Sequence, residues 1–291
     1  MTIRPRRSLL YMPGSNPRAL DKARSLPADG LILDMEDSVA PDAKALAREQ
    51  IGAALAGGGY GHRELIVRIN ALSTEWGEAD IKAICAFPNA PDAVLIPKID
   101  TAGDVVEAIS AFEKAGCPDS VAMWIMAETP LCILNIAEVA AAHPRLAGIV
   151  MGTSDLSKDT RVRHTPDRLG FITALNLCVY AGRAHGLTII DGVQLDLENE
   201  ELLRLSCEQG RDLGFDGKSL IHPKQLAAAN AAFAPDEKEL AAARDIIAGF
   251  EEAMALGKGV VVVNGRLVEN LHVEEAKRQL ALAEAIAALE P

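Results

Sequence analysis

Two carboxylates stand at the ends of neighbouring apolar runs, where they could bind a hard divalent cation. Glu128 follows the run from Val121 to Ala127, and Asp155 follows the run from Gly148 to Met151. If both runs are strands of one parallel barrel, the two carboxylates lie at the same end of it. Mg²⁺ prefers oxygen ligands and often takes only one or two carboxylates from the protein. A metal-assisted reaction is therefore the leading hypothesis.

Other polar residues follow further apolar runs and are candidates for the same site. They are Asp34, Glu36, Asp37, Arg68, Asn70, Lys98 and Asp191. A single acid at a strand end is more often a helix cap than a catalyst. The number of candidates at one barrel end, rather than any one of them, favours an active site there. Asp37 could still cap a helix that begins near Asp42, and Lys98 could serve only as the partner of a carboxylate.

The sequence does not favour several other kinds of site. The 6 histidines form no H-x-H or H-x-x-x-H pair, so a zinc site of histidines is not expected. The 5 cysteines form no C-x-x-C pair, which indicates buried thiols in a reducing cytosol. There is no G-x-S-x-G motif, and the glycines at 57–59 lack the Lys and Ser/Thr of a P-loop.

The charge balance limits the kinds of partner. The chain has 41 acidic and 29 basic residues, a net charge of −12, which argues against nucleic acid and anionic membranes. We see no apolar stretch long enough for a signal peptide or a membrane span. We therefore expect a soluble, cytoplasmic protein.

Positive charge is concentrated in the first 24 residues. This cluster consists of Arg4, Arg6, Arg7, Arg18, Lys22 and Arg24, against the single acid Asp21. Arg18 and Lys22 are spaced to share one helix face, and Gly14-Ser15 precedes that helix, so the cluster suits a polyanion such as a nucleotide. A solvated helix face is the alternative.

The apolar runs predict the fold. Most are near-continuous and precede a stretch of helical period, as expected for buried parallel strands. Their number and spacing predict a (β/α)8 barrel over residues 1–233, with a doubly wound open sheet as the alternative. The runs cover residues 8–13, 31–35, 65–69, 93–96, 121–127, 148–151, 187–190 and 214–221.

The pattern changes after residue 233. Residues 236–256 predict an amphipathic helix, 260–268 a hairpin with an Asn264-Gly265 turn, and 273–289 a last helix. A two-stranded hairpin is marginal alone, so we expect this C-terminal extension, residues 234–291, to pack on the barrel or on a neighbouring subunit. We therefore expect the protein to form a homo-oligomer.

Several segments together resemble the HpcH/HpaI aldolase and citrate lyase β-subunit superfamily, in particular its malyl-CoA and citramalyl-CoA lyase branch. The resemblance runs from about Arg6 to Ala285 with the blocks in the same order, so it is more specific than any single motif. The blocks are RRSLLYMPG at 6–14, LDMEDSVAP at 33–41, VRIN at 67–70, LIPK at 95–98, ET at 128–129, DG at 191–192, GFDGK at 214–218 and IHP at 221–223.

The resemblance implies a role for each site residue. Glu128 and Asp155 would bind Mg²⁺, and Arg68 would bind the carboxylate or carbonyl oxygen of the small acid. The part of the substrate that is coenzyme A would be held by Tyr11, Arg18 and Lys22.

The resemblance also implies a catalytic carboxylate on the C-terminal hairpin, which in several members reaches an adjacent subunit of a trimer or hexamer. The usual pattern G-x-x-I-D-x-P reads GRLVENL here, so the carboxylate is Glu269 and the proline is absent. If Glu269 is not the base, the catalytic base would be sought among Glu36, Asp37 and Asp34.

These expectations lead to an Mg²⁺-dependent acyl-CoA lyase that cleaves a malyl-CoA-like thioester into an acyl-CoA and a 2-oxo acid. The longer side chain of Glu269 makes a malyl-CoA thioesterase, releasing malate and CoA, the main alternative. A citrate lyase β subunit acting on a carrier-protein thioester is a third possibility. A non-catalytic CoA-binding subunit is disfavoured by the presence of Arg68, Glu128 and Asp155.

Overall fold

The computed structural model describes residues 3–289, which divide into two compact units. One unit runs from Arg6 to Ala231, and the other consists of residues 3–5 and 232–289. The boundary that we predicted after residue 233 stays a prediction of where the catalytic domain ends.

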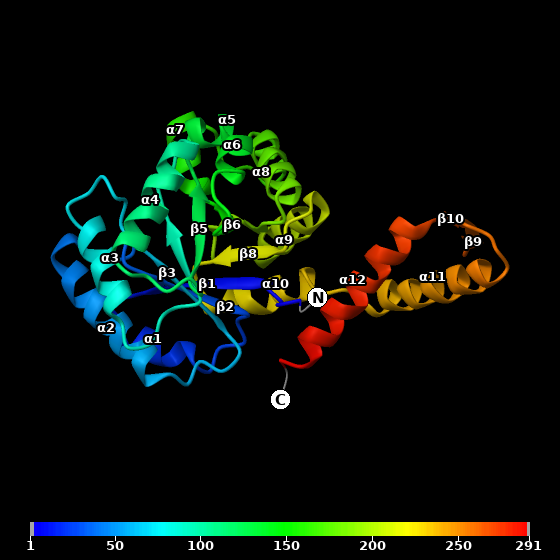
Figure 1. Ribbon diagram of the computed structural model, residues 1–291, viewed down its shortest axis with the longest axis horizontal. Helices are drawn as coiled ribbons and strands as arrows, with labels where there is room; N and C mark the ends of the chain where they lie inside the picture. Colours follow the sequence, from blue (N-terminus) through cyan, green and yellow to red (C-terminus); the bar gives the residue numbers. More distant parts are fainter. Residues whose placement is uncertain (1–2, 290–291) are drawn as a thin grey trace. The chain divides into compact units, whose positions relative to one another are not determined.

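Within residues 3–289, eight parallel strands close into one barrel in sequence order, with helices between successive strands (Figure 1). The predicted (β/α)8 barrel is therefore confirmed, and the open sheet is excluded. The strands are β1 (Ser8–Pro13), β2 (Gly30–Asp34), β3 (Glu64–Arg68), β4 (Ala93–Ile96), β5 (Ala122–Ala127), β6 (Leu146–Met151), β7 (Thr188–Asp191) and β8 (Gly217–Leu220).

Helices surround the barrel. They are α1 (Pro17–Ala23), α2 (Lys44–Gly57), α3 (Gly77–Ala86), α4 (Ala102–Lys114), α5 (Pro130–Leu134), α6 (Ile136–Ala140), α7 (Thr153–Thr160), α8 (Ile172–Ala184), α9 (Glu200–Leu213) and α10 (Leu226–Ala232), with 3-10 turns at Pro41–Ala43 and Pro223–Gln225.

The strands are mostly apolar because both of their faces are buried. Leu9, Ile32, Ile66 and Trp124 belong to the cluster that fills the barrel. Side chains alternate along a strand, so the residues between them face the helices. Leu10 is one of these, and it is also fully buried. A continuous apolar run thus gives no sign of which residues point inward.

Local sequence signals fix where helices begin and end. The Asn16 side chain accepts a hydrogen bond from the Ala19 amide at 3.1 Å, with Pro17 as the first residue of α1. Thr101 and Asp104 cap each other's backbone at the start of α4. Both helix starts thus follow from capping residues that can be read in the sequence.

The C-terminal unit contains α11 (Glu237–Ala255), the antiparallel strands β9 (Val261–Val263) and β10 (Arg266–Val268), and α12 (Asn270–Ala287). Asn264 and Gly265 have φ values of 49° and 78°, as a type I′ turn requires. The predicted helix–hairpin–helix order is therefore present. The last helix begins three residues before the predicted start.

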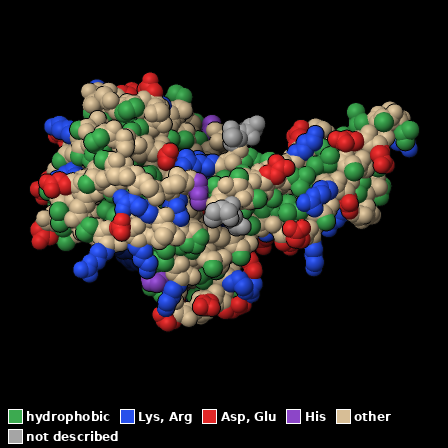
Figure 2. All heavy atoms as spheres, turned by 90° about the horizontal axis from the view of Figure 1, so that it is seen from below, with side chains coloured by type: hydrophobic (Ala, Val, Ile, Leu, Met, Phe, Trp, Pro, Cys, Tyr) green, Lys and Arg blue, Asp and Glu red, His purple; other side chains and the backbone are tan. Residues whose placement is uncertain are grey.

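Charged side chains of both signs are interspersed over the face of the molecule drawn in Figure 2. Among the described residues, no helix is both long and apolar enough to span a membrane.

Candidate active site

The side of the barrel mouth formed by β2 and β3 contains a buried guanidinium–carboxylate pair. Asp34 and Arg68 are the last residues of their strands and lie in register, with both side chains turned into the barrel. Arg68 Nε and Nη2 donate to Asp34 Oδ1 and Oδ2, each at 2.7 Å. Burial would raise the pKa of Asp34, but the charge and hydrogen bonds of Arg68 outweigh it and lower that pKa. The pair is therefore ionised.

The remaining nitrogen of Arg68, Nη1, faces two more acids. It donates to Asp37 Oδ2 at 3.2 Å and lies 2.9 Å from Glu36 Oε2, although that oxygen is not aligned for a hydrogen bond. Burial, and secondarily the charges of Asp37 and Glu128, raises the pKa of Glu36 to about 8, against the opposing effect of Arg68. Glu36 is thus a carboxyl group that can carry a proton near neutral pH.

Tyr11 lies beneath Arg68. Its ring packs on the interior cluster of the barrel, and the Arg68 guanidinium stacks over it at 4.8 Å from the ring centre. The Tyr11 hydroxyl is 4.0 Å from Met126 Sδ, and burial raises its pKa. Tyr11 therefore lines the centre of the mouth as a neutral phenol.

Two side chains hydrogen-bond to the backbone of the loop that carries Glu36. Lys44 Nζ donates to the carbonyl oxygens of Met35 at 2.8 Å and Glu36 at 2.7 Å. Asn70 Nδ2 donates to the same Met35 carbonyl at 3.0 Å and to Asp80 at 2.7 Å. Asn70 is thus a support of the loop, and Lys44 is a support that we did not predict from the sequence.

Glu128 and Asp155 lie on the β5–β6 side of the mouth and share one cation, the ammonium of Lys98. Lys98 Nζ is 3.2 Å from Glu128 Oε1 and also hydrogen-bonds to Asp155. The Lys98 amide donates to Glu128 Oε1 at 2.8 Å, from a backbone in the left-handed region with φ 55°. The predicted proximity of the two carboxylates is therefore present, and Lys98 is the partner of both.

The environments of the two carboxylates differ. Glu128 is 1% exposed, and its burial raises its pKa. Burial acts in the same direction on Asp155, but the hydrogen bond and charge of Lys98 outweigh it and lower the Asp155 pKa. The pair thus offers one buried carboxylate and one that remains anionic at neutral pH.

The pair fits a hard divalent cation. Its donors are carboxylate oxygens, and they are already arranged to share a positive charge. A Cβ at Gly152 would lie 2.3 Å from Glu128 Cβ, so glycine makes room for this side chain. Among the described residues, no group of three or more His, Cys, Asp or Glu could hold a metal. Water or substrate would have to supply the other ligands.

The basic cluster of the first 24 residues does not form one face. Arg6 pairs with Glu64, with Nη2 at 2.8 Å from Oε1, and Arg7 pairs with Asp29 at 2.8 Å. Both arginines precede β1 and so lie at the opposite end of the barrel from the mouth. The prediction is therefore wrong for these two residues, because a strand separates them from α1.

Arg18 and Lys22, by contrast, are exposed on α1, which begins just after the mouth end of β1. Neither forms an ion pair within residues 3–289. They remain candidates for binding a polyanion.

Asp191 does not belong to the mouth, contrary to expectation. Ile190 points into the barrel, so its neighbour Asp191 points to the helix layer. There it accepts hydrogen bonds from Arg168 Nη1, at 2.8 and 2.7 Å, and from Lys218 Nζ at 2.8 Å. Arg168 was missed because it lies in an irregular loop with no sequence signal.

Glu269 is a half-buried residue of the C-terminal unit, at the N-cap position of α12. Its backbone N–H donates to His272 Nδ1 at 3.0 Å. Its role as a base stays a prediction.

The fold and the site define a (β/α)8-barrel protein with a polar mouth that is suited to bind a cation and an acid. The chain belongs to the HpcH/HpaI aldolase/citrate lyase family, whose model matches residues 7–223. The family that the sequence resembled is thereby confirmed.

Two curated relatives span nearly the whole chain. A (3S)-malyl-CoA thioesterase of Cereibacter sphaeroides strain KD131 is 54% identical over 98% of this chain and 96% of its own length. The citrate lyase subunit beta of Escherichia coli K12 is 37% identical over 97% of this chain and 94% of its own.

A solved structure supports the same family. Protein CitE from Mycobacterium tuberculosis, in complex with magnesium, acetoacetate and coenzyme A, has 26% identity and a TM-score of 0.78. The match covers 98% of this chain and all of that one.

Proposed function

We propose that this chain is an Mg²⁺-dependent thioesterase that hydrolyses (3S)-malyl-CoA or a closely related 3-hydroxyacyl-CoA. The observation that carries this proposal is the 54% identity, over 98% of the chain, to a (3S)-malyl-CoA thioesterase. The sequence alone favours carbon–carbon cleavage over hydrolysis, and this identity favours hydrolysis instead. The reaction site is the mouth built from Arg68, Glu128 and Asp155.

Glu128 and Asp155 would hold the Mg²⁺ ion. The carboxylate donors, the space left by Gly152 and the magnesium in the CitE complex support this assignment. When bound, Mg²⁺ polarises substrate oxygens and stabilises negative charge that develops on them. The remaining chemistry belongs to side chains of this chain.

Arg68 would bind the free carboxylate of the acyl group through Nη1, since Asp34 occupies its other two nitrogens. A protonated Glu36 beside Nη1 would tolerate an incoming carboxylate, whereas an ionised one would repel it. Tyr11 in the mouth, and Arg18 and Lys22 on α1, are proposed to contact the coenzyme A part.

In hydrolysis, the oxygen of a water molecule attacks the thioester carbonyl carbon, the C–S bond breaks, and the sulfur takes a proton and leaves as the thiol of CoA. A base must remove a proton from the attacking water. We assign this role to Glu269, with Glu36 and Asp37 as the alternatives. The longer side chain of Glu, compared with the Asp usual at this position, supports a base placed for water.

A second candidate is the lyase reaction, favoured by the 37% identity to a citrate lyase subunit beta. There the bond between C2 and C3 of the acyl chain breaks, giving an acyl-CoA and a 2-oxo acid. The base would then exchange a proton with the carbon next to the thioester. A subunit that acts only on a carrier-protein thioester is the third candidate.

One product assay separates these functions. Purified protein with malyl-CoA and MgCl₂ should release malate and free thiol in equal amounts, and excess EDTA should stop the release. Acetyl-CoA with glyoxylate would instead establish the lyase, and no product from the free thioester would overturn both.

The same assay tests Glu269. Glu269→Gln should lower the rate by about 10²-fold or more, the usual contribution of a positioned base. Glu269→Asp should change the malate-to-glyoxylate ratio in favour of carbon–carbon cleavage. If neither variant alters rate or ratio, the base is not Glu269, and Glu36 and Asp37 become the next residues to change.

A further inference from the structure

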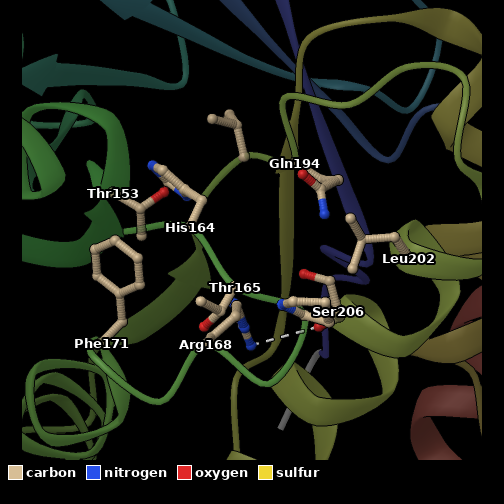
Figure 3. Close-up of a pocket in the computed structure, with 10 residues that line it drawn as sticks. Thr153, His164, Thr165, Arg168, Phe171, Gln194, Leu202 and Ser206 are labelled. Carbon is tan, nitrogen blue, oxygen red and sulfur yellow. Dashed lines mark hydrogen bonds between the residues drawn. The ribbon is translucent and has the colours of Figure 1, made fainter. Parts of the chain in front are cut away.

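We propose that a small pocket beside α7 binds the carboxylate group of a short monocarboxylic acid. The pocket lies between the loop that joins α7 to α8 and the loop that follows β7, and its volume is about 60 Å³. This is several times the roughly 10–15 Å³ that one water molecule needs. Its walls include Thr153, His164, Arg168, Phe171, Gln194 and Ser206 (Figure 3).

An unpartnered hydroxyl faces this pocket. Thr153 is 4% exposed, and its Oγ1 has no hydrogen-bond partner within residues 3–289. In Figure 3 this hydroxyl points toward the neighbouring side chain of His164. Leaving such a group unsatisfied costs about 1–3 kcal/mol. The hydroxyl therefore offers a hydrogen bond to a ligand in the pocket.

The neighbouring backbone is shaped around Thr153. A Cβ at Gly192 would lie 2.6 Å from both Oγ1 and Cγ2 of Thr153. Only glycine at position 192 lets the threonine side chain keep this place. The buried position of the hydroxyl is thus built into the loop after β7.

The charges at the pocket favour an anion. Its lining contains no Asp or Glu, in a chain whose net charge is −12. Arg168 and Lys218 both hydrogen-bond to Asp191, so two basic side chains share a single carboxylate. Arg168 Nη2 makes only a long contact, 3.4 Å, to the Ser206 carbonyl, shown as the dashed line in Figure 3. It can therefore donate to a further acceptor.

The size and the apolar wall limit the ligand to one with few carbons. Pro166, Phe171, Val193 and Leu202 form the apolar part of the lining. A carboxylate with one or two carbons matches this combination of a polar and an apolar wall. Because Thr153 precedes Asp155 by two residues, a bound acid would also restrain the start of α7.

Thermal unfolding without Mg²⁺ tests this site, with sodium acetate as the probe and sodium chloride at equal ionic strength as the reference. Acetate should raise the Tm of the natural chain relative to chloride. Thr153→Val keeps the shape but removes the hydroxyl, so its Tm in chloride should be equal or higher, and the acetate-specific rise should vanish. Thr160→Val, an exposed threonine at the other end of α7, should retain that rise.

Direct titration gives the second readout. Acetate should bind Thr153→Val about tenfold or more weakly, as expected for loss of a hydrogen bond to a charged group. Malate, which is larger, should not distinguish this variant from the natural chain. Gln194→Leu provides an independent variant of the lining and should also weaken acetate binding.

Two results would overturn the proposal. One is an acetate-specific rise in Tm that is equal in the natural chain and in both pocket variants, since acetate would then bind elsewhere. The other is no acetate-specific rise at all. Neither readout uses turnover, so the outcome is independent of the proposed thioesterase activity.

Discussion

The two edges of the Arg68 guanidinium have different partners. Asp34 occupies Nε and Nη2 with two 2.7 Å hydrogen bonds, while Nη1 faces Glu36 and Asp37. A bidentate pair of this kind fixes the plane of the guanidinium, which lysine cannot do. Asp34 therefore fixes the orientation of Nη1. The protonation state of Glu36 sets how far the positive charge at Nη1 is neutralised before an acid binds.

A first prediction concerns Glu36, whose pKa is raised from its usual 4.5 to about 8. Between these values the folded chain keeps a proton that the unfolded chain releases, so stability falls as pH rises. Glu36→Gln removes this loss, and its stability relative to the natural chain should improve by at least about 1 kcal/mol from pH 5.5 to 8.5. Urea unfolding in EDTA at several pH values measures this. A constant difference would show that Glu36 is ionised throughout.

A second prediction concerns the carboxylate pair. Glu128→Gln should abolish Mg²⁺ binding in a titration and reduce thioester turnover by about 10²-fold or more, because metal-assisted charge stabilisation is lost. Asp159→Asn, an exposed acid four residues beyond Asp155 on α7, is the matched control and should behave like the natural chain. Normal Mg²⁺ binding by Glu128→Gln would contradict the metal assignment.

At the scale of elements, the segment that joins β6 to α7 sets the place of Glu128. Gly152→Ala would bring a Cβ to 2.3 Å from Glu128 Cβ and 2.8 Å from its Oε2. The third prediction is that this variant folds but binds Mg²⁺ at least about tenfold more weakly, since ligand misplacement is costly. Gly103→Ala is the control. Its Cβ would meet only Thr101 Oγ1, at 3.5 Å, and its Mg²⁺ affinity should not change.

Helix α1 carries the fourth prediction. Arg18→Glu and Lys22→Glu should raise KM for the CoA thioester while changing kcat little, as expected when binding is weakened equally in the ground and transition states. Steady-state kinetics at low ionic strength measures the split. Arg24→Glu is a poorer test, because Arg24 already bonds to Asp21 and to the Gly58 carbonyl. An unchanged KM would show that Arg18 and Lys22 do not bind the substrate and belong to a solvated helix face.

The strand order and the helix starts could be predicted from sequence because they depend on local signals. Continuous apolar runs and the caps at Asn16 and Thr101 are such signals. The direction in which each strand side chain points, into the barrel or toward the helices, could not be predicted. In a strand buried on both sides, nothing in the sequence shows that Asp34 points inward and Asp191 outward. The left-handed backbone of Lys98 gives no sequence signal either.

At the scale of the whole molecule, the C-terminal unit has a small core. Its buried cluster consists of Phe250, Val268 and Val273, beside a hairpin of two three-residue strands. A core of this size gives limited independent stability. We therefore propose that the extension docks on a larger surface, in a homotrimer or hexamer where Glu269 serves a neighbouring subunit.

The fifth prediction tests this sharing of sites. Glu128→Gln and Glu269→Gln should each be inactive alone. When the two are unfolded, mixed and refolded, some sites combine an intact Glu128 from one chain with an intact Glu269 from another, and activity should return. Light scattering gives the number of chains. A mixture that stays inactive while forming mixed oligomers would place both residues in the same chain.

The ammonium of Lys98, set between Glu128 and Asp155, has a consequence for ion exchange. Being tethered, it competes at a local concentration on the order of millimolar or above. Any cation that bridges the carboxylates must displace this ammonium, and the ammonium returns when the cation leaves. The two carboxylates thus never repel each other uncompensated. A divalent cation bound by this pair, as proposed above, would therefore exchange readily, and its occupancy would follow its concentration in the surrounding solution.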